Sequence, residues 1–228
     1  MPGESSRSRE KEKRLPENGG WRGCDSLAGS PKQKDRATGT NEKLAYGTGY
    51  ATDGPNPTKL TLETMKGKKM ARVLISYYSR SGNTRKMAEK IRDGAASVEG
   101  VEVVLQKIAE TGIDDMRQAD GLIFGSPTYF GVMAAEVKDL IDRSVKYFGK
   151  MVGKAGGAFT SSGGIGGGNE TTIASILQAW LIHGMVVQGQ QKGSHYGPVA
   201  VGAPDERAEE ECVAYGRMMA ELTLRLSR

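Results

Sequence analysis

The sequence predicts an α/β fold, a doubly wound five-stranded parallel sheet with strand order 2-1-3-4-5. Five short apolar segments alternate with longer segments in which apolar residues recur every three or four positions. This alternation favours a parallel sheet with right-handed crossovers and helices on both faces. Polar or glycine-rich stretches follow the first, third and fourth apolar segments. In such a sheet, ligands bind at the carboxyl ends of the strands, where the strand order reverses.

The first strand is predicted within residues 71–78, because residues 73–75 form the short apolar run expected of a strand buried on both faces. An amphipathic helix is predicted to follow the polar loop after it. A loop at a helix N-terminus offers free backbone N–H groups and a positive dipole end, which together bind phosphate without a lysine. The alternative is an ordinary capped strand-to-helix turn. The loop residues are Ser79, Arg80, Ser81, Gly82, Asn83 and Thr84.

The remaining strands are predicted at residues 101–105, 121–125, 156–160 and 185–187, with a polar linking stretch at residues 106–120. Three more helices are expected from their apolar faces. The first face holds Val137, Leu140, Ile141 and Val145. The second holds Ile173, Ile176, Leu177, Trp180 and Leu181. The third, which should cover the sheet, holds Ala208, Cys212, Tyr215, Met219, Leu222 and Leu226.

Residues 1–69 are predicted to be a disordered basic extension, because they hold few large apolar side chains and show no hydrophobic periodicity. They carry 14 Lys and Arg and 9 Asp and Glu, which leaves 18 of each sign in residues 70–228. The net charge of +5 therefore belongs to the extension, and a nucleic acid partner is not expected. We favour a solvated extension, or upstream sequence that precedes a start at Met65 or Met70.

Composition excludes several classes of site and location. Cys24 and Cys212 are the only cysteines and the chain has two histidines, so neither a disulfide framework nor a metal site is expected. No apolar run approaches the ~18 residues of a membrane span. Acidic residues near the N-terminus argue against a transit peptide. We therefore expect a cytoplasmic protein without a membrane span.

The loop after the third strand places a stiff proline, a hydroxyl group and two aromatic rings at the mouth of the sheet. Such a set suits one edge and one face of a planar ring. The alternative is a proline turn whose aromatic rings pack into the core. The candidate residues are Pro127, Thr128, Tyr129, Phe130 and Gly131.

The loop after the fourth strand has five glycines in the eight residues 161–168. Glycine weakens a local fold, but it lets a backbone lie against a ligand, and the bare N–H groups can stabilise negative charge. The alternative is a flexible surface linker. The candidate residues are Ser161, Ser162, Gly163, Gly164, Ile165 and Gly166.

Taken in series, four segments over residues 71–228 resemble the flavodoxin-like NAD(P)H:quinone oxidoreductases of the WrbA type. The segments are YYSRSGNT, IFGSPTYFG, SSGGIGGGNETT and LIHGM. The resemblance implies a flavodoxin-like FMN-binding domain over residues 70–228. It also implies an enzyme that transfers a hydride from NAD(P)H through FMN to a quinone or a similar two-electron acceptor.

The resemblance implies a role for each candidate segment. Residues 79–84 would surround the FMN phosphate, the loop around residues 128–130 would lie beside the ring, and residues 161–166 would follow the polar edge of the ring. His183 would line the substrate side as a catalytic residue, and a packed structural role is its alternative. Homodimers or homotetramers are also implied, with the apolar, glycine-rich loops as the contact region.

Some features depart from this family. The segment after the second strand is short, no Trp occurs between Lys146 and Ala155, and Tyr129 replaces a commonly basic residue. These departures concern the quinone preference rather than FMN binding. A flavodoxin-type carrier of single electrons is the main alternative function, although carriers are usually strongly acidic near the flavin and residues 70–228 are formally neutral. A flavin-free interaction module is a further alternative.

Overall fold

A computed structural model describes residues 70–228, and the expectations for residues 1–69 lie outside the described residues. The sheet has the order β2-β1-β3-β4-β5, and all its strand pairs are parallel. The strands are β1 (Ala71–Tyr77), β2 (Val101–Lys107), β3 (Gly121–Pro127), β4 (Ala155–Ser162), β5 (Val186–Val187) and β6 (Val199–Val201). The predicted order 2-1-3-4-5 is confirmed, with β6 as an additional strand beside β4.

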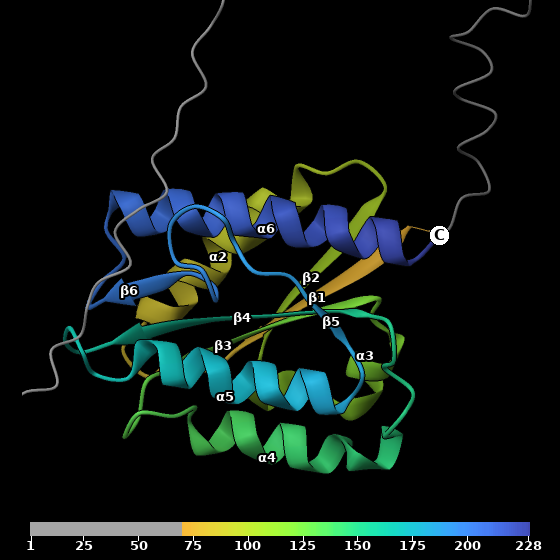
Figure 1. The fold of residues 1–228 in the computed structure, drawn as a ribbon, viewed down its shortest axis with the longest axis horizontal. Helices are drawn as coiled ribbons and strands as arrows, with labels where there is room; N and C mark the ends of the chain where they lie inside the picture. The colour runs from red at the N-terminus through yellow and green to blue at the C-terminus, as the bar shows by residue number, and fades with distance from the viewer. Residues whose placement is uncertain (1–69) are drawn as a thin grey trace, which may run out of the picture. The chain divides into compact units, whose positions relative to one another are not determined.

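Helices cover both faces of the sheet (Figure 1). Helices α2 and α6 contribute to the core on one face, and α3, α4 and α5 to the core on the other. The helices are α2 (Asn83–Ala96), α3 (Ile113–Gln118), α4 (Ala135–Arg143), α5 (Asn169–Ile182) and α6 (Glu206–Leu226), with the short 3-10 helices η2 (Ile108–Glu110) and η3 (Ser144–Tyr147). Within residues 70–228, no helix combines the length and the apolar character that crossing a membrane requires.

The apolar run of β1 explains why the sheet has two cores. Val73 and Ile75 pack into the core that α2 and α6 cover, whereas Leu74 packs into the opposite core. Side chains alternate between the two faces of a strand, and all three side chains are almost completely buried. A central strand covered on both sides therefore needs a continuous apolar run rather than an alternating one.

Three glycines allow α2, α6 and β4 to pack closely against one another. A Cβ atom at Gly94 of α2 would collide with the carbonyl oxygen of Val213, and one at Gly216 of α6 would collide with the carbonyl oxygen of Ile91. In β4, a Cβ atom at Gly157 would lie 2.5 Å from the Tyr215 hydroxyl. We call these three residues the packing glycines, because the protein's own atoms exclude a side chain there.

The fifth position of the sheet is divided between two very short strands. Strand β5 pairs with the first two residues of β4, and β6 pairs with residues 160–162 near its end. Between them, two side chains bond to the backbone of β4. The N–H group of Ala158 donates to the Tyr215 hydroxyl at 3.0 Å, and the Trp180 indole N–H donates to the carbonyl oxygen of Gly157 at 3.0 Å.

Several details of the sequence prediction were wrong. The stretch at residues 106–120 is not only a link, because it contains η2 and α3. Helix α4 ends at Arg143 and continues as a 3-10 helix, which leaves Val145 70% exposed rather than on the buried face. Leu181 of α5 is likewise exposed. The three-residue strand β6 was not expected at all.

Candidate functional site

Three loops lie together at the carboxyl ends of β1, β3 and β4. They comprise residues 78–82, 128–134 and 163–168, and each leads into a helix. The three strands are neighbours in the order β1-β3-β4 and run parallel, so their loops emerge at one edge of the sheet. This edge includes the point where the strand order reverses, which is where ligands bind in doubly wound folds.

Hydrogen bonds join these loops into one unit. The hydroxyl groups of Thr84 and Ser161 share a buried hydrogen bond of 2.9 Å. The N–H group of Thr128 donates to the carbonyl oxygen of Ser161 at 2.8 Å. The Thr171 hydroxyl donates to the carbonyl oxygen of Gly131 at 2.6 Å. The sequence therefore folds so that the three candidate segments support one another.

The first loop leaves the N-terminus of α2 open. Gly82 precedes the helix with a φ of 95°, a left-handed conformation that favours glycine. Neither a side-chain cap nor an acidic residue occupies the first turn of α2, although the Ser79 hydroxyl accepts from the Gly82 N–H group at 3.1 Å. The free N–H groups and the positive end of the helix dipole can therefore bind an anion.

The side chains of the first loop point to different surroundings. Ser79, Gly82 and Asn83 are half-buried, Arg80 and Ser81 are exposed, and Thr84 is buried. Because the Thr84 hydroxyl already bonds to Ser161, it anchors the loop to β4.

The second loop presents aromatic rings to the surface. Tyr129 lies edge-on to Tyr78, with the ring centres 6.4 Å apart. Phe130 is completely exposed and has a φ of 50°, the one non-glycine residue with a positive φ among residues 70–228. Exposure and left-handed backbone are both unfavourable for a phenylalanine, and such strain is found preferentially at functional sites. The alternative interpretation, in which the aromatic rings of this loop pack into the core, is thus wrong for Phe130.

Other residues of the second loop hold its shape. Pro127 ends β3, and the Thr128 hydroxyl shares a hydrogen bond of 3.1 Å with that of Thr160. Gly131 lies against Gly168, where a Cβ atom would be only 2.6 Å from the Gly131 Cα. The second and third loops therefore touch backbone to backbone.

The third loop has glycines that the protein itself does not require. Ser161 and Ser162 are the buried end of β4, and the Ser162 hydroxyl donates to the carbonyl oxygen of Gly164 at 2.9 Å. A Cβ atom at Gly163 or Gly164 would meet nothing within 4 Å, and neither residue has a positive φ. We call these two residues the open glycines. Ile165 beside them is 94% exposed.

His183 does not join the three loops within one chain. His183 caps the C-terminal end of α5, close in sequence to Val186, whose N–H group donates to the carbonyl oxygen of Lys154 just before β4 begins. The glycine-rich loop lies at the other end of this 14-residue helix. At 1.5 Å per residue, the helix separates the two ends by about 20 Å. The catalytic role that the resemblance implies for His183 stays a prediction.

The surroundings of His183 define its charge and tautomer. The Ser144 hydroxyl donates to the carbonyl oxygen of Ile141 at 2.6 Å and lies 2.9 Å from His183 Nε2. Since the hydroxyl has a single proton, His183 Nε2–H must donate to it, so we assign the Nε2–H tautomer. Burial lowers the pKa of His183 below its usual value. The imidazole is therefore neutral near pH 7 and packs beside Trp180 and Phe148.

Sequence reasoning missed several residues beside the loops. Tyr78 packs on Tyr129, and the Glu136 carboxylate next to it raises the pKa of the Tyr78 phenol. Arg85 and Lys107 line a cleft beside the first loop. Arg85 lies on α2, five residues after Arg80, and this spacing was the one sequence signal for a basic cluster. Lys107 belongs to β2, and only the fold brings it to the cleft.

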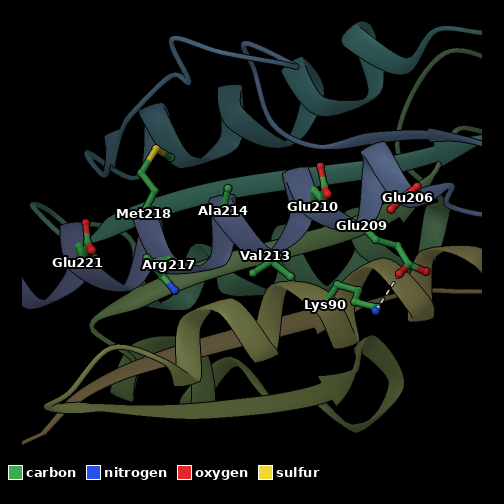
Figure 2. A pocket seen from close by; sticks show the side chains of 9 residues that line it. All are labelled: Lys90, Glu206, Glu209, Glu210, Val213, Ala214, Arg217, Met218 and Glu221. Carbon is green, nitrogen blue, oxygen red and sulfur yellow. Dashed lines mark ion pairs between the residues drawn. The ribbon is translucent and has the colours of Figure 1, made fainter.

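Another hollow, of about 640 Å³, runs along α2 and α6 (Figure 2). Four glutamates of α6 stand beside it, and Glu209 forms an ion pair with Lys90 at 2.8 Å. None of the buried polar atoms that lack a partner in the described region belongs to its walls. We therefore assign it no ligand. In residues 70–228, no group of three His, Cys, Asp or Glu side chains could hold a metal ion.

Comparisons with known proteins agree with this geometry. The family model described as NADPH-dependent FMN reductase matches residues 105–197. A flavodoxin from Aquifex aeolicus is 41% identical over 160 residues, which cover 67% of this chain and 86% of the relative. An NAD(P)H dehydrogenase (quinone) from Archaeoglobus fulgidus is 31% identical over 191 residues, which cover 69% of this chain and all of the relative.

The solved structures give the same result. A WrbA-like flavodoxin from Agrobacterium tumefaciens is 26% identical, with a TM-score of 0.60 over 68% of this chain and 98% of that one. A flavodoxin from the domain Archaea is 25% identical, with a TM-score of 0.56 over 69% of this chain and 99% of that one. The chain therefore belongs to the WrbA-type flavodoxin-like family.

Proposed function

We propose that this protein is an FMN-dependent oxidoreductase in which NAD(P)H donates a hydride to FMN, and a quinone or a similar two-electron acceptor then receives the electrons. The observation that carries the proposal is the pair of open glycines. None of the described residues excludes a side chain at Gly163 or Gly164, and a ligand lying on the backbone would account for glycine at both positions. Bound FMN supplies the redox chemistry, and the chain supplies binding and electrostatics.

The first loop fits the phosphate end of FMN. The uncapped N-terminus of α2 offers backbone N–H groups, and residues 79–84 add hydroxyl and amide groups around them. A helix N-terminus needs no lysine to bind phosphate. The bond between Thr84 and Ser161 holds this loop against β4, so the phosphate and ring ends of the site keep a fixed spacing.

The second and third loops fit the flavin ring. Thr128, Tyr129 and Phe130 lie on the β3 side, and the exposed ring of Phe130 offers an apolar face to a planar group. On the β4 side, backbone N–H groups of residues 161–166 can donate to the ring's carbonyl oxygens without side chains in the way. Such fixed donors stabilise negative charge as it develops. Ile165, exposed beside them, can shield the ring from water.

Two potential nucleophiles in residues 70–228, Cys212 and Tyr215, are held in their neutral forms. Burial raises the pKa of the Cys212 thiol to about 12, and burial also raises the pKa of the Tyr215 phenol. Neither group ionises near neutral pH, and both are residues of α6 that are buried in the core. This agrees with a reaction in which the cofactor does the redox chemistry and the protein binds and orients.

The second candidate function is that of a one-electron carrier. The flavodoxin relative from Aquifex aeolicus, at 41% identity, favours it. Against it stands the formally neutral charge of residues 70–228, because carriers dock on partner proteins through strongly charged surfaces. The two functions share the same FMN site and differ in their electron donors.

Anaerobic stopped-flow absorbance of the FMN-loaded full chain separates the two candidates. We expect NADH or NADPH to bleach the flavin in a single two-electron step, and benzoquinone to restore its absorbance rapidly. If the flavin binds tightly but ignores both nucleotides, and dithionite passes it through a stable one-electron-reduced form, the carrier function is correct instead. A chain that binds no FMN contradicts both.

We also propose that the chain assembles as a homodimer or homotetramer. Phe130, Val132 and Ile165 are all exposed apolar residues at the loop tips, and a contact that covered them would remove that apolar area from water. Light scattering of the full chain, with an Ile165→Ser variant beside the wild type, tests this. We expect the variant to dissociate at higher concentrations than the wild type. A monomeric wild type would overturn the proposal.

A further inference from the structure

A basic cleft adjoins the first loop on the side away from the flavin-ring loops. It has a volume of about 420 Å³, within the range of small-molecule sites. One wall is the end of β1 and the first loop, and the other is formed by Lys107, Ile108 and Ala109 where β2 passes into η2. Since β2 and β3 lie on opposite sides of β1, the cleft and the ring-binding loops flank the first loop on opposite sides.

Three cations line this cleft: Arg80, Arg85 and Lys107. The carboxylates that face them are Glu89, 3.7 Å from Arg85, and Glu110, 3.4 Å from Lys107. Both pairs are at least 44% exposed at every side chain, so they neutralise the cations weakly. Arg80 forms no ion pair with any of the residues that the structure describes. No acidic side chain is among the residues that line the cleft.

This much positive charge exceeds what the FMN phosphate needs. The N-terminus of α2 already supplies N–H donors and a positive dipole end for that phosphate. The cleft also has apolar walls beyond the loop, from Tyr77, Tyr78, Ile108 and Ala109. A basic cleft with apolar walls suits a second anionic group that carries a flat, apolar body.

We infer that this cleft binds the adenosine half of the electron donor together with its 2′-phosphate, so that the protein prefers NADPH to NADH. The inference rests on the proposed function, because it assumes a nicotinamide nucleotide as donor. Arg85 and Lys107 contact the 2′-phosphate, and the forked guanidinium of Arg85 matches the geometry of phosphate oxygens. The adenine ring lies against the apolar wall at Ile108 and Ala109.

An equilibrium measurement tests the cleft without turnover. Isothermal titration calorimetry of the FMN-loaded full chain compares adenosine 2′,5′-bisphosphate with adenosine 5′-monophosphate. We expect the bisphosphate to bind roughly tenfold or more tightly, in line with hydrogen bonds to a charged group. The Arg85→Gln/Lys107→Gln double variant should lose this difference. Lys86→Gln, which removes an exposed cation on the same helix outside the cleft, should keep it.

Kinetics and FMN binding complete the test. We expect the ratio of kcat/KM for NADPH to that for NADH to fall roughly tenfold or more in the double variant and to stay unchanged in Lys86→Gln. Equal use of both nucleotides by the wild type overturns the inference. So does an FMN affinity that falls as much as bisphosphate affinity in the double variant, because the cations would then serve the FMN phosphate.

The outcomes also separate this inference from the proposed function. If neither nucleotide reduces the flavin, yet the bisphosphate binds and the double variant abolishes its preference, the proposed reaction fails and the cleft remains a site for phosphorylated adenosine. If both nucleotides reduce the flavin and calorimetry shows no preference for the bisphosphate, the reaction stands and the cleft assignment fails.

Discussion

The body of the molecule and the loop after β4 use glycine for opposite reasons. At Gly94, Gly157 and Gly216 a Cβ atom would collide with the protein's own backbone or core side chains. At Gly163 and Gly164 it would enter open space. The first group is explained by packing within one chain, whereas the second has no explanation inside the chain. This difference is the reason for our proposal that a ligand lies against the backbone at Gly163 and Gly164.

The largest effect is expected at the crossing of α2 and α6. Gly216→Ala places a methyl group against the carbonyl oxygen of Ile91, and two backbones must separate to admit it. The gain in helix propensity, about 1 kcal/mol, does not offset this. We expect the free energy of unfolding to fall by about 2 kcal/mol or more, measured by urea denaturation followed by circular dichroism. An unchanged stability would break the distinction between packing and open glycines.

A smaller and different effect is expected at the open glycines. Gly164→Ala should leave the unfolding free energy of the flavin-free protein within about 0.5 kcal/mol of wild type, as surface substitutions usually do. It should weaken FMN binding roughly tenfold, or about 1.4 kcal/mol, because the methyl group occupies the backbone surface that the ring needs. Flavin fluorescence titration measures the affinity. Loss of stability without loss of affinity would contradict the ligand explanation.

Phe130 extends the comparison between packing and loop positions, because it is a non-glycine residue with a left-handed backbone in the second loop. Asn tolerates the left-handed backbone better than Phe, so Phe130→Asn should raise the stability of the flavin-free protein by up to about 1 kcal/mol and weaken FMN binding. Phe130→Ala is the matched control, since it also removes the aromatic ring but keeps a residue that disfavours the left-handed backbone. Equal effects of the two variants on stability would mean that backbone strain at Phe130 is not the cause.

The smallest effect is expected at His183, which is buried at the C-terminal end of α5, away from the three loops. Because burial lowers its pKa in the folded state, the unfolded chain binds a proton more readily at mildly acidic pH. The stability that comes from neutral His183 is therefore present above its unfolded pKa, about 6.5, and is lost as the pH falls below it. Urea denaturation between pH 5 and 8 should show a flatter pH profile for His183→Gln. Identical profiles would contradict this assignment.

The sequence predicted the parts of the fold that are long and periodic. The apolar run at residues 73–75, followed by polar residues and a helical pattern, located β1, the first loop and α2. Helix α3 escaped prediction because six residues are fewer than two helical turns, too short for a periodic pattern. Strand β6 escaped because three residues after Pro198 resemble any loop end. Val145 was misplaced because a helical pattern does not show where the helix tightens into a 3-10 turn.

The candidate site was predictable to a similar degree. Topology alone brings the loops after β1, β3 and β4 to one edge, and the structure joins them as expected. For Phe130 the sequence left two interpretations open, a ring at the mouth of the sheet and a ring in the core, because aromatic residues usually pack inward; only the structure shows the ring exposed. The distance of His183 from the loops follows from the length of α5, which sequence could have given. The basic cleft depends on Arg85 of α2 and Lys107 of β2 lining the same space, and no local pattern encodes that.

The division of the fifth sheet position between β5 and β6 has a consequence for self-association through unpaired strands. An uninterrupted outer strand presents a row of free N–H and C=O groups that can template cross-β aggregation. Here the outermost segments on this side offer two and three residues each, and side chains from α5 and α6 bond to β4 between them. The interruption thus shortens the outer edge beside β4 that could otherwise template such growth.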